Sequence, residues 1–300
     1  MEETFFSLKE ALINPAAVKR LDLHSNKLTE FPEEICTLEN LEELALMNNK
    51  IKTIPDNISS LKNLKRLDLS GNELDTISDG ICGLQNLEVL IVSWNNLSEI
   101  PESIGQLTGL MYFSLSNNKI VKLPESFSKL TNLKELVLSE NKIDSLPSGI
   151  GNLVNLIKFR SDCNVISQLP DSICDLMSLE KLELSENSLS SLPENFGNLS
   201  NLRKLRLSKN SLTALPDSFC NLGKLTKLLL FENDLKSLPT AFGQLSSLER
   251  LDLSYNALEE LPSGITNLKS LNQFDLTKNS INKKSISEIQ KQIKGVKIEF

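Results

Sequence analysis

The side chains that could do acid–base, nucleophilic or metal chemistry are few and scattered in this sequence. His24 is the only histidine among 300 residues. Ser-His catalysis, Cys-His catalysis and multi-histidine metal binding all require a histidine beside their other parts, so each lacks a component. Acid pairs such as Glu183 and Glu186 occur, but regular exposed strands give them no closed cleft that would raise a pKa. We therefore expect no catalytic site, no metal and no cofactor, and we interpret His24 as an exposed surface residue.

The elements that must position any functional side chain are defined by an asparagine that recurs every 23 residues. Its positions are Asn26, Asn49, Asn72, Asn95, Asn118, Asn141, Asn164, Asn187, Asn210, Asn233, Asn256 and Asn279. Such a repeat indicates a solenoid, in which one small unit is stacked many times. The amide carries two donors and an acceptor that suit a turn at the end of a strand. We expect a buried, hydrogen-bonded column of these asparagines, which we call the ladder asparagines.

Two apolar periods coexist in each repeat. Leu44 and Leu46 alternate with the period of a strand, whereas Ile54, Ile58 and Leu61 have the spacing of a helical or 3₁₀-like turn. Each repeat is therefore expected to be a short strand, a bend and a helical return. A unit this small cannot bury its apolar face alone, so consecutive repeats must stack strand beside parallel strand.

The consensus L-x-x-L-x-L-x-x-N-x-L, followed by x-x-L-P-x-x-I/F-x-x-L, resembles the leucine-rich repeat family over roughly residues 18–282. It is most similar to the 23-residue subclass of intracellular Ras-group and bacterial leucine-rich repeat proteins. The resemblance implies an α/β solenoid, a horseshoe with a parallel β-sheet on the concave face and short helical or 3₁₀ returns on the convex face. It also implies ligand recognition on the concave face, with signalling proteins or small GTPases as a partner class and no particular partner identified.

Both ends of the sequence depart from the repeat. We expect an N-terminal helical cap over residues 1–17, twelve strand units over residues 18–282, and a helix–strand cap over residues 283–300. The first cap is predicted to place Phe5, Leu8, Ala11 and Leu12 on one face of a helix that ends before Pro15.

The second cap is predicted from a helix signal near the C-terminus. Ser285 and Glu288 have the spacing of a capping box, Gly295 is placed to end the helix, and residues 296–300 are predicted to form a short strand. With this cap in place, we expect nothing catalytic to follow it.

Function is expected in side chains that alternate outward six, four and two positions before each ladder asparagine. A first apolar patch is predicted from Val89, Ile91, Trp94, Tyr112 and Val137. A second, smaller one is predicted from Leu229, Phe231 and Tyr255. The first outward column is basic late in the chain, with Lys158, Lys181, Lys204, Lys227 and Arg250.

These groups indicate protein binding. Exposed aromatic clusters are typical interface anchors, and a basic stretch that includes Lys158, Arg160, Lys181 and Arg206 suits the orientation of an acidic protein partner. The alternative interpretation is a solvated charge ladder with scattered apolar residues. A separate irregularity is Ser161, which replaces a core leucine. Either the core repacks, with Phe159 filling part of the volume, or a bulge turns Ser161 outward, and we favour repacking.

Composition limits the partners and the cellular compartments that suit this protein. The net charge of −7 and the pI near 5.1 disfavour nonspecific binding to nucleic acid or to anionic membranes. No apolar run is long enough to span a bilayer, and the start of the sequence, with Glu2 and Glu3, lacks the features of a signal peptide. Cys36 and Cys82 are two repeats apart, as are Cys174 and Cys220, about 10 Å and so beyond disulfide reach. Reduced thiols favour a cytoplasmic protein, and export without a standard signal peptide is the alternative.

Together these features predict a noncatalytic protein–protein interaction module, expected to be a monomer and possible as a signalling scaffold, that binds a protein partner on its concave face. Two other interpretations stay open at this point. One is an exported, host-directed or extracellular recognition protein. The other is the targeting half of a multi-chain enzyme.

Overall fold

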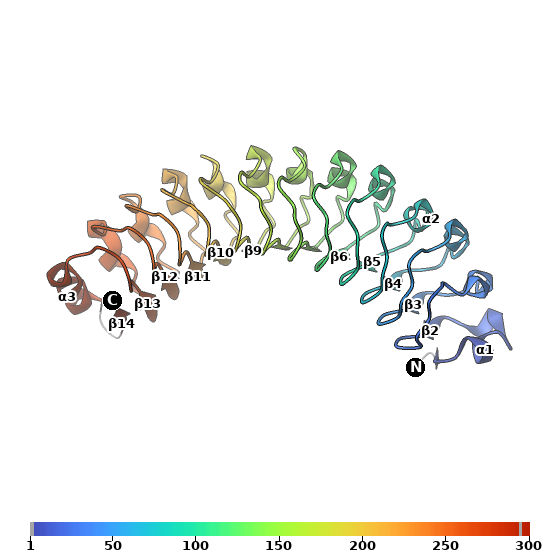
Figure 1. Ribbon diagram of the computed structural model, residues 1–300. Coiled ribbons are helices and arrows are strands. Elements are labelled where there is room, and N and C mark those ends of the chain that lie inside the picture. Colours follow the sequence, from blue (N-terminus) through green and yellow to red (C-terminus); the bar gives the residue numbers. More distant parts are fainter. Residues whose placement is uncertain (1–2, 294–295) are drawn as a thin grey trace. The chain divides into compact units, whose positions relative to one another are not determined.

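The computed structural model describes residues 3–293 and 296–300. The chain divides into two compact units, unit 1 (Met1–Ile143) and unit 2 (Asp144–Phe300). Within each unit, short parallel strands line one side of the stacked coils and helical returns line the other (Figure 1). We call the outward side of the strands the strand face of each unit.

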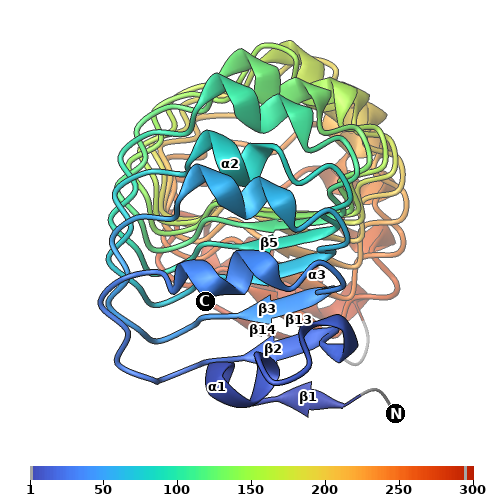
Figure 2. The ribbon, with the colours of Figure 1, turned by 90° about the vertical axis from the view of Figure 1, so that its right-hand side faces the viewer.

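Unit 1 contains seven strands, each paired in parallel with the next. They are β1 (Thr4–Phe5), β2 (Arg20–Asp22), β3 (Glu43–Ala45), β4 (Arg66–Asp68), β5 (Val89–Ile91), β6 (Tyr112–Ser114) and β7 (Glu135–Val137). The helical segments are α1 (Leu8–Ala11), η1 (Pro15–Ala17), η2 (Glu33–Thr37), η3 (Asp56–Ser60), α2 (Asp79–Cys82), η4 (Glu102–Gln106) and η5 (Glu125–Lys129). Figure 2 shows β2, β3 and β5 in one layer and α2 on the opposite side of the coil.

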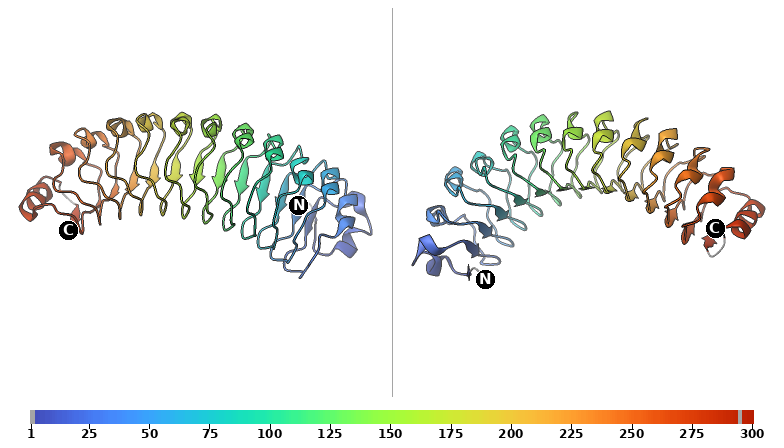
Figure 3. Two further views of the ribbon diagram at one scale, coloured as in Figure 1. Left: turned by 45° about the horizontal axis from the view of Figure 1, so that its top comes forward. Right: turned by 180° about the vertical axis from the view of Figure 1, so that it is seen from behind.

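Unit 2 repeats this architecture. Its strands are β8 (Lys158–Arg160), β9 (Lys181–Glu183), β10 (Lys204–Arg206), β11 (Lys227–Leu229), β12 (Arg250–Asp252), β13 (Gln273–Asp275) and β14 (Lys297–Glu299). The returns are η6 (Ile150–Asn152), η7 (Asp171–Asp175), η8 (Phe196–Asn198), η9 (Asp217–Asn221), η10 (Phe242–Gln244) and η11 (Ser263–Asn267), and the helix α3 (Lys283–Gln292) lies between β13 and β14. Figure 3 gives two further views of the strands and returns.

The strand register follows directly from the 23-residue period. Leu44 pairs with Leu67, and Glu43 with Arg66, so equivalent residues of successive repeats lie side by side. Leu44 and Leu67 are buried in the interior, while Glu43 and Arg66 leave the opposite face. Strands β2 to β13 have only three residues each, because the chain must bend at the ladder asparagine to begin its return. The expected alternation is therefore confirmed.

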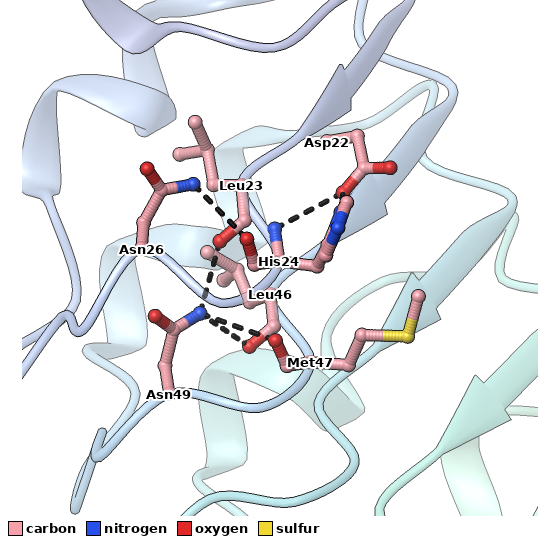
Figure 4. Close-up of polar contacts among 7 residues, drawn as sticks. All are labelled: Asp22, Leu23, His24, Asn26, Leu46, Met47 and Asn49. Carbon is pink, nitrogen blue, oxygen red and sulfur yellow. Dashed lines mark hydrogen bonds and ion pairs between the residues drawn. The ribbon is translucent and has the colours of Figure 1, made fainter.

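The ladder asparagines satisfy the backbone at this bend, as Figure 4 shows for the first two. The Nδ2 of Asn49 donates to the carbonyl oxygens of Leu46 at 2.9 Å and of Leu23 in the preceding repeat at 3.0 Å. Its Oδ1 accepts from the Leu28 N–H at 3.0 Å. Asn26 begins the column and is exposed, with a contact from Nδ2 to the His24 carbonyl at 3.2 Å. A ladder asparagine thus ties each repeat to the one before it.

A second asparagine ladder lies at the entry to the strands. The Nδ2 of Asn40 donates to the carbonyl of Ala16 at 2.9 Å, a contact that spans one repeat. The same contact recurs at Asn63, Asn86, Asn132 and Asn201. The sequence signal for this second ladder is the asparagine that recurs nine residues before a ladder asparagine. The signal is weaker than that of the ladder asparagines because other residues interrupt it, namely Gly109, Ser178, Lys224, Ser247 and Ser270.

The returns are 3₁₀ turns that prolines begin. Pro55 and Pro101, for example, hold the position before η3 and η4 with φ of −72° and −68°. At Ser78, where the proline is missing, the return is the short α-helix α2 instead. In unit 2, the returns bury a row of stacked rings: Phe219 lies 6.0 Å from Phe196 and 6.5 Å from Phe242, measured between ring centroids.

Ser161 is repacked into the interior. It is fully buried, and its backbone keeps the regular contact from the Ser161 N–H to the Glu183 carbonyl at 2.8 Å, so no bulge is present. The Nδ2 of Asn164 donates to the Ser161 hydroxyl at 3.2 Å, which satisfies the buried oxygen. Phe159, in the strand β8 that ends just before Ser161, is also fully buried. The favoured interpretation is confirmed.

The ends differ in part from the prediction. Phe5 lies in strand β1, paired with Leu21, and not on a helix, because the edge of β2 offers unpaired backbone groups to residues 4 and 5. Helix α1 keeps only residues 8–11 of the predicted helix. At the other end Asn282, not Ser285, is the N-cap of α3, and its Oδ1 accepts from the Lys284 N–H at 2.8 Å. Strand β14 forms as expected, whereas Gly295 lies outside the described residues.

Among the described residues, every helix is too short or too polar to cross a membrane. Cys36, Cys82, Cys174 and Cys220 are free thiols. Burial raises the pKa of each, to about 11 at Cys174, where Asp171 and Asp175 contribute further. These four thiols are therefore kept in their unreactive, protonated form near neutral pH.

Candidate functional site

The strand face of unit 1 carries apolar side chains on two adjacent strands. Val89 and Ile91 leave β5 on this face, and Tyr112, the partner of Val89 in the register, leaves β6. All three are partly exposed. The structure therefore brings these predicted site residues together, since equivalent positions of neighbouring repeats are aligned.

Trp94 belongs to the same region but not to a strand. Its side chain is 65% exposed, and its backbone φ is 58°. It occupies the turn one residue before the ladder Asn95, where the Trp94 carbonyl accepts from the Asn72 N–H at 3.2 Å. Trp94 therefore stands at the exit edge of the strand face.

All twelve repeats have a positive φ at this turn position. The residues are Ser25, Asn48, Gly71, Trp94, Asn117, Glu140, Cys163, Glu186, Lys209, Glu232, Tyr255 and Lys278. A positive φ is unfavourable for any side chain with a Cβ, least so for asparagine, and a bulky aromatic residue there is a genuine outlier. Trp94 and Tyr255 are the two aromatic residues in this series. Both are more than half exposed, so these are the two turns at which an exposed aromatic side chain stands on a backbone conformation that is unfavourable for it.

Val137 is a correction. It was expected to complete the first apolar patch, but only 8% of it is exposed. Val137 lies in the middle outward column, four residues before a ladder asparagine, where Asp68, Ser114 and Glu183 are also buried. Side chains of the outer columns and of adjacent strands surround this column. Alternation predicts the direction of a side chain but not how far its neighbours cover it.

In unit 2, the predicted basic residues converge on one acid. Glu183 on β9 has a side chain only 5% exposed, and its carboxylate lies 3.1 Å from Arg160 Nε, 3.0 Å from Lys181 Nζ and 3.1 Å from Arg206 Nε. The contacts to Oε1 lack hydrogen-bond geometry within the described residues, so they are ion pairs. Arg160, Lys181 and Arg206 are therefore brought together, as the columns predicted. Lys158 begins the neighbouring strand β8 and is exposed.

Asp162 borders this cluster. Burial raises the pKa of its carboxyl from 3.8 to about 6, and the nearby Glu183 adds to the rise. The Ser185 N–H, which donates to Oδ1 at 2.8 Å, and the Arg206 guanidinium act in the opposite direction. Asp162 consequently changes charge close to neutral pH.

The second predicted apolar group lies on β11 and the turn of the following repeat. Leu229 and Phe231 are half-buried, and Tyr255 is 53% exposed with a φ of 53°. Leu229 pairs with Arg206 on one side and Asp252 on the other. The apolar group is therefore set among charged side chains, unlike the group in unit 1.

The arrangement offers little for catalysis. His24 is exposed, and its Nδ1 lies 2.8 Å from the Asp22 carboxylate. Within residues 3–293 and 296–300, no three His, Cys, Asp or Glu side chains are placed to hold a metal ion. Two open hollows of about 230 and 250 Å³ lie beside edge strands, one lined by Arg20, Asp22 and Glu43, the other by Arg250, Asp275 and Glu299. Neither hollow includes Trp94, Tyr112 or Phe231.

Comparisons with known proteins agree with this geometry. Family models described as a leucine-rich repeat region match residues 102–206 and 182–295, and models described as a leucine-rich repeat match residues 16–74 and 39–97. A comparison with curated proteins found no match.

Three solved structures illustrate the similarity. A leucine-rich repeat protein of Leptospira interrogans is 28% identical over 100% of both chains, with a TM-score of 0.51. The leucine-rich repeat ectodomain of the receptor kinase GASSHO1/SCHENGEN3 from Arabidopsis thaliana, in complex with CASPARIAN STRIP INTEGRITY FACTOR 2, is 28% identical over 93% of this chain and 37% of that chain, with a TM-score of 0.71. This chain thus spans little more than a third of that ectodomain.

The third is the leucine-rich repeat protein FLRT2, solved in an octameric complex with Latrophilin 3 and Unc5D. It is 28% identical over 92% of this chain and 87% of that chain, with a TM-score of 0.73. Because the family models cover well over half of the sequence, the chain belongs to the leucine-rich repeat family, whose domains typically serve as noncatalytic protein–protein interaction modules.

Proposed function

We propose that this protein is a noncatalytic binding module that captures a protein partner on the strand face of unit 1, with Trp94 and Tyr112 as its anchors. The observation that carries the proposal is Trp94, the only tryptophan of the chain, which is 65% exposed at a positive φ of 58°. Two unfavourable features coincide in one residue, which favours a role outside folding.

The neighbours of Trp94 support an interface. Val89, Ile91 and Tyr112 give partly exposed apolar area on β5 and β6. Two serine hydroxyls lie among these apolar residues in the repeat pattern. Ser93 Oγ and Ser114 Oγ are buried and hydrogen-bond to each other at 2.7 Å, so neither needs a partner protein to satisfy it. Tryptophan and tyrosine are enriched among residues that dominate binding energy. The apolar side chains therefore form a desolvatable centre with few polar groups that a partner must satisfy.

A protein fits this surface better than a small molecule does. The two hollows beside the edge strands do not include Trp94 or Tyr112, whereas small ligands are usually enclosed in a concave cavity. The similar FLRT2 structure is a complex with Latrophilin 3 and Unc5D, and the GASSHO1/SCHENGEN3 structure is a complex with CASPARIAN STRIP INTEGRITY FACTOR 2. In this proposal the protein acts as a monomeric scaffold in a reducing, cytoplasmic setting that suits its four unreactive thiols, and signalling proteins such as small GTPases are one partner class.

The test is site-specific photo-crosslinking in intact cells. Benzoylphenylalanine replaces Tyr112 in one variant and Lys129 of the return η5 in a control variant. The proposal expects a defined protein adduct from position 112 and not from position 129. The adduct partner, once purified, should bind the wild type about tenfold or more tightly than Trp94→Asn. Glu140→Asn, at the same turn position with the same φ, should bind like the wild type.

Equal crosslinking from positions 112 and 129, or equal affinity of the wild type and Trp94→Asn, would reject the chosen anchors. Trp94→Asn and Glu140→Asn both introduce an asparagine, which the chain already has at this turn position in Asn48 and Asn117, with φ of 57° and 55°. Misfolding is therefore not expected to obscure the result.

A second candidate function is recognition outside the cell. It is favoured by the 28% identity to the ectodomain of a plant receptor kinase. Cell fractionation separates the two candidates, because accumulation in the medium without lysis supports export and retention with cytoplasmic markers supports the first proposal.

A further inference from the structure

Three cationic side chains form a row on the strand face of unit 2. Lys204, Lys227 and Arg250 begin β10, β11 and β12, and the register places them directly beside one another. Adjacent strands lie about 4.8 Å apart, so the three Cα atoms fall within about 10 Å. Lys204 and Arg250 are exposed and Lys227 is half-buried. We call these three residues the cationic row.

The cationic row has no counterion in the part of the chain that the structure describes. No carboxylate there lies within ion-pair distance of Lys204, Lys227 or Arg250, whereas Glu183 is already shared among Arg160, Lys181 and Arg206. The pKa of Lys227 is lowered, first by burial of its ammonium group and then by the charges of Arg206, Arg250 and Lys204, while the charge of Glu183 acts weakly in the opposite direction.

Like charges placed opposite one another on adjacent strands destabilise a sheet. The chain nevertheless aligns five cations in succession here, Lys158, Lys181, Lys204, Lys227 and Arg250, of which the last three form the cationic row. It does so although its net charge is −7 and acids outnumber bases. A bound anion would relieve the repulsion, so the row is suited to an anionic ligand.

An apolar group lies beside the cationic row. Leu229 and Phe231 follow Lys227 at intervals of two residues, so the three side chains leave the same face of the sheet. Tyr255 lies at the turn of the next repeat, next in register to the turn residue Glu232, whose N–H donates to the Ser254 carbonyl at 3.0 Å. Leu229, Phe231 and Tyr255 form what we call the apolar group of unit 2.

The surroundings limit the size and type of the anion. Asp252 and Asp275 pair with each other in register on β12 and β13, beside the end of the row at Arg250. They would repel the continuous phosphates of a nucleic acid that extended past Arg250. The row is also linear and open, whereas a single phosphate is best held where donors converge around it. A short run of carboxylates joined to an apolar side chain matches both features.

We propose that the cationic row and the apolar group bind a short, extended segment of a partner protein that combines two or more carboxylates with a large apolar side chain. The carboxylates lie over Lys204, Lys227 and Arg250, and the apolar side chain packs on Leu229, Phe231 and Tyr255. Extended main chain places side chains on one face about 6.8 Å apart, so carboxylates two residues apart reach different cations of the row. The inference rests on the protein-binding function proposed above and specifies the chemistry of one partner segment.

The test is selection of random dodecapeptides displayed on phage against the full chain at low ionic strength. The second target is the cationic-row variant Lys204→Gln/Lys227→Gln/Arg250→Gln. Glutamine is chosen because Gln273 occupies the equivalent position of the next strand, β13. A control with the same change of charge is Lys236→Gln/Lys269→Gln/Lys283→Gln, whose side chains lie outside the strand face. Each enriched peptide is then synthesised and its Kd measured by fluorescence anisotropy.

The expected outcome is enrichment of peptides with clustered acids and a large apolar residue. Their Kd should rise about tenfold or more in the cationic-row variant and stay within about twofold in the control. Phe231→Ser should weaken the same peptides, because it removes the centre of the apolar group. Added salt should weaken binding in the wild type, since exposed charges are screened.

Several outcomes would overturn the inference. They are enrichment of peptides without acids, equal affinity for the wild type and the cationic-row variant, absence of any enrichment, or tighter binding of a single-stranded oligonucleotide than of every peptide. Peptide binding retained in Trp94→Asn/Tyr112→Ser separates this site from the one in unit 1. Failure here leaves the crosslinking result at Tyr112 unaffected, so failure of this inference can be distinguished from failure of the function proposed above.

Discussion

The strand faces of the two units use one scaffold for opposite chemistry. At the outward positions of unit 1 there are two cations and four acids; they are Arg20, Arg66, Asp22, Glu43, Asp68 and Glu135. The same positions of unit 2 hold seven cations and four acids; they are Lys158, Arg160, Lys181, Lys204, Arg206, Lys227, Arg250, Asp162, Glu183, Asp252 and Asp275. Unit 1 presents its aromatic residues beside hydroxyls, whereas unit 2 presents them among charges.

The comparison shows which positions of the repeat differ between the two units and which do not. Both units keep the ladder asparagines, the inward leucines and the positive φ before each asparagine. Because those residues hold the repeats together, the outward positions are the ones left for recognition. The two binding sites proposed above differ in chemistry because these outward positions differ between the units.

The largest expected effect concerns the return side, where unit 2 stacks Phe196, Phe219 and Phe242 and unit 1 has isoleucines at most equivalent positions. Phe219→Ala removes the middle ring and should lower the free energy of unfolding by about 3–5 kcal/mol. Phe219→Ile, which copies unit 1, should lose roughly 1–2 kcal/mol, since the volume is largely kept. Urea unfolding measures both. A loss below about 1 kcal/mol in Phe219→Ala would show that the stack is unimportant.

The next effect is the pH dependence that Asp162 gives to unit 2 and that Ser116 and Ser139 cannot give to unit 1. The folded pKa, about 6, lies above the ordinary 3.8, so the folded state binds the extra proton between these values. The free energy of unfolding contributed by Asp162 therefore falls as the pH rises from 3.8 to 6, by up to about 3 kcal/mol.

Asp162→Asn should consequently gain stability relative to the wild type over this range and keep the gain at higher pH. Urea titrations between pH 3.5 and 7.5 measure the difference. Asp162→Ser, which installs the residue of Ser139 and Ser185, should follow the same trend. A stability difference that does not change with pH would contradict the raised pKa.

A smaller effect separates the ion pairs of the two units. Glu183→Gln removes the carboxylate that Arg160, Lys181 and Arg206 share. Because the Glu183 side chain is only 5% exposed, the change should lower the free energy of unfolding by about 2–3 kcal/mol. Glu43→Gln in unit 1 removes an exposed partner of Arg20 and should cost less than about 1 kcal/mol. Equal losses in the two variants would mean that burial does not distinguish the pairs.

Much of the fold was predictable because the period fixes the register. Once Asn49 and Asn72 are known to align, Leu44 must lie beside Leu67 and Val89 beside Tyr112, as the structure has them. The internal position of Ser161 was also predictable, since a bulge would have broken contacts that its neighbours supply.

The rest could not be read from periodicity. Alternation gives the direction of Val137 but not its burial, which depends on the size of all surrounding side chains. The strand at Phe5 depends on the free edge of β2, a tertiary feature with no local signal. The positive φ at Trp94 was detectable only by comparison of all twelve repeats, where Gly71, Asn48 and Asn117 indicate a left-handed turn.

The smallest expected effect is the most informative about Trp94. If Trp94 is retained for binding, Trp94→Asn should raise the free energy of unfolding by about 0.5–1 kcal/mol, because asparagine tolerates a φ of 58° better and exposes less apolar area. Glu140→Asn, at the same φ in another repeat of unit 1, gives the gain from backbone conformation alone. Denaturant midpoints of the two variants provide the comparison. A loss of stability in Trp94→Asn beside a gain in Glu140→Asn would mean that the indole packs against the scaffold, and the anchor proposed for unit 1 would have to be abandoned.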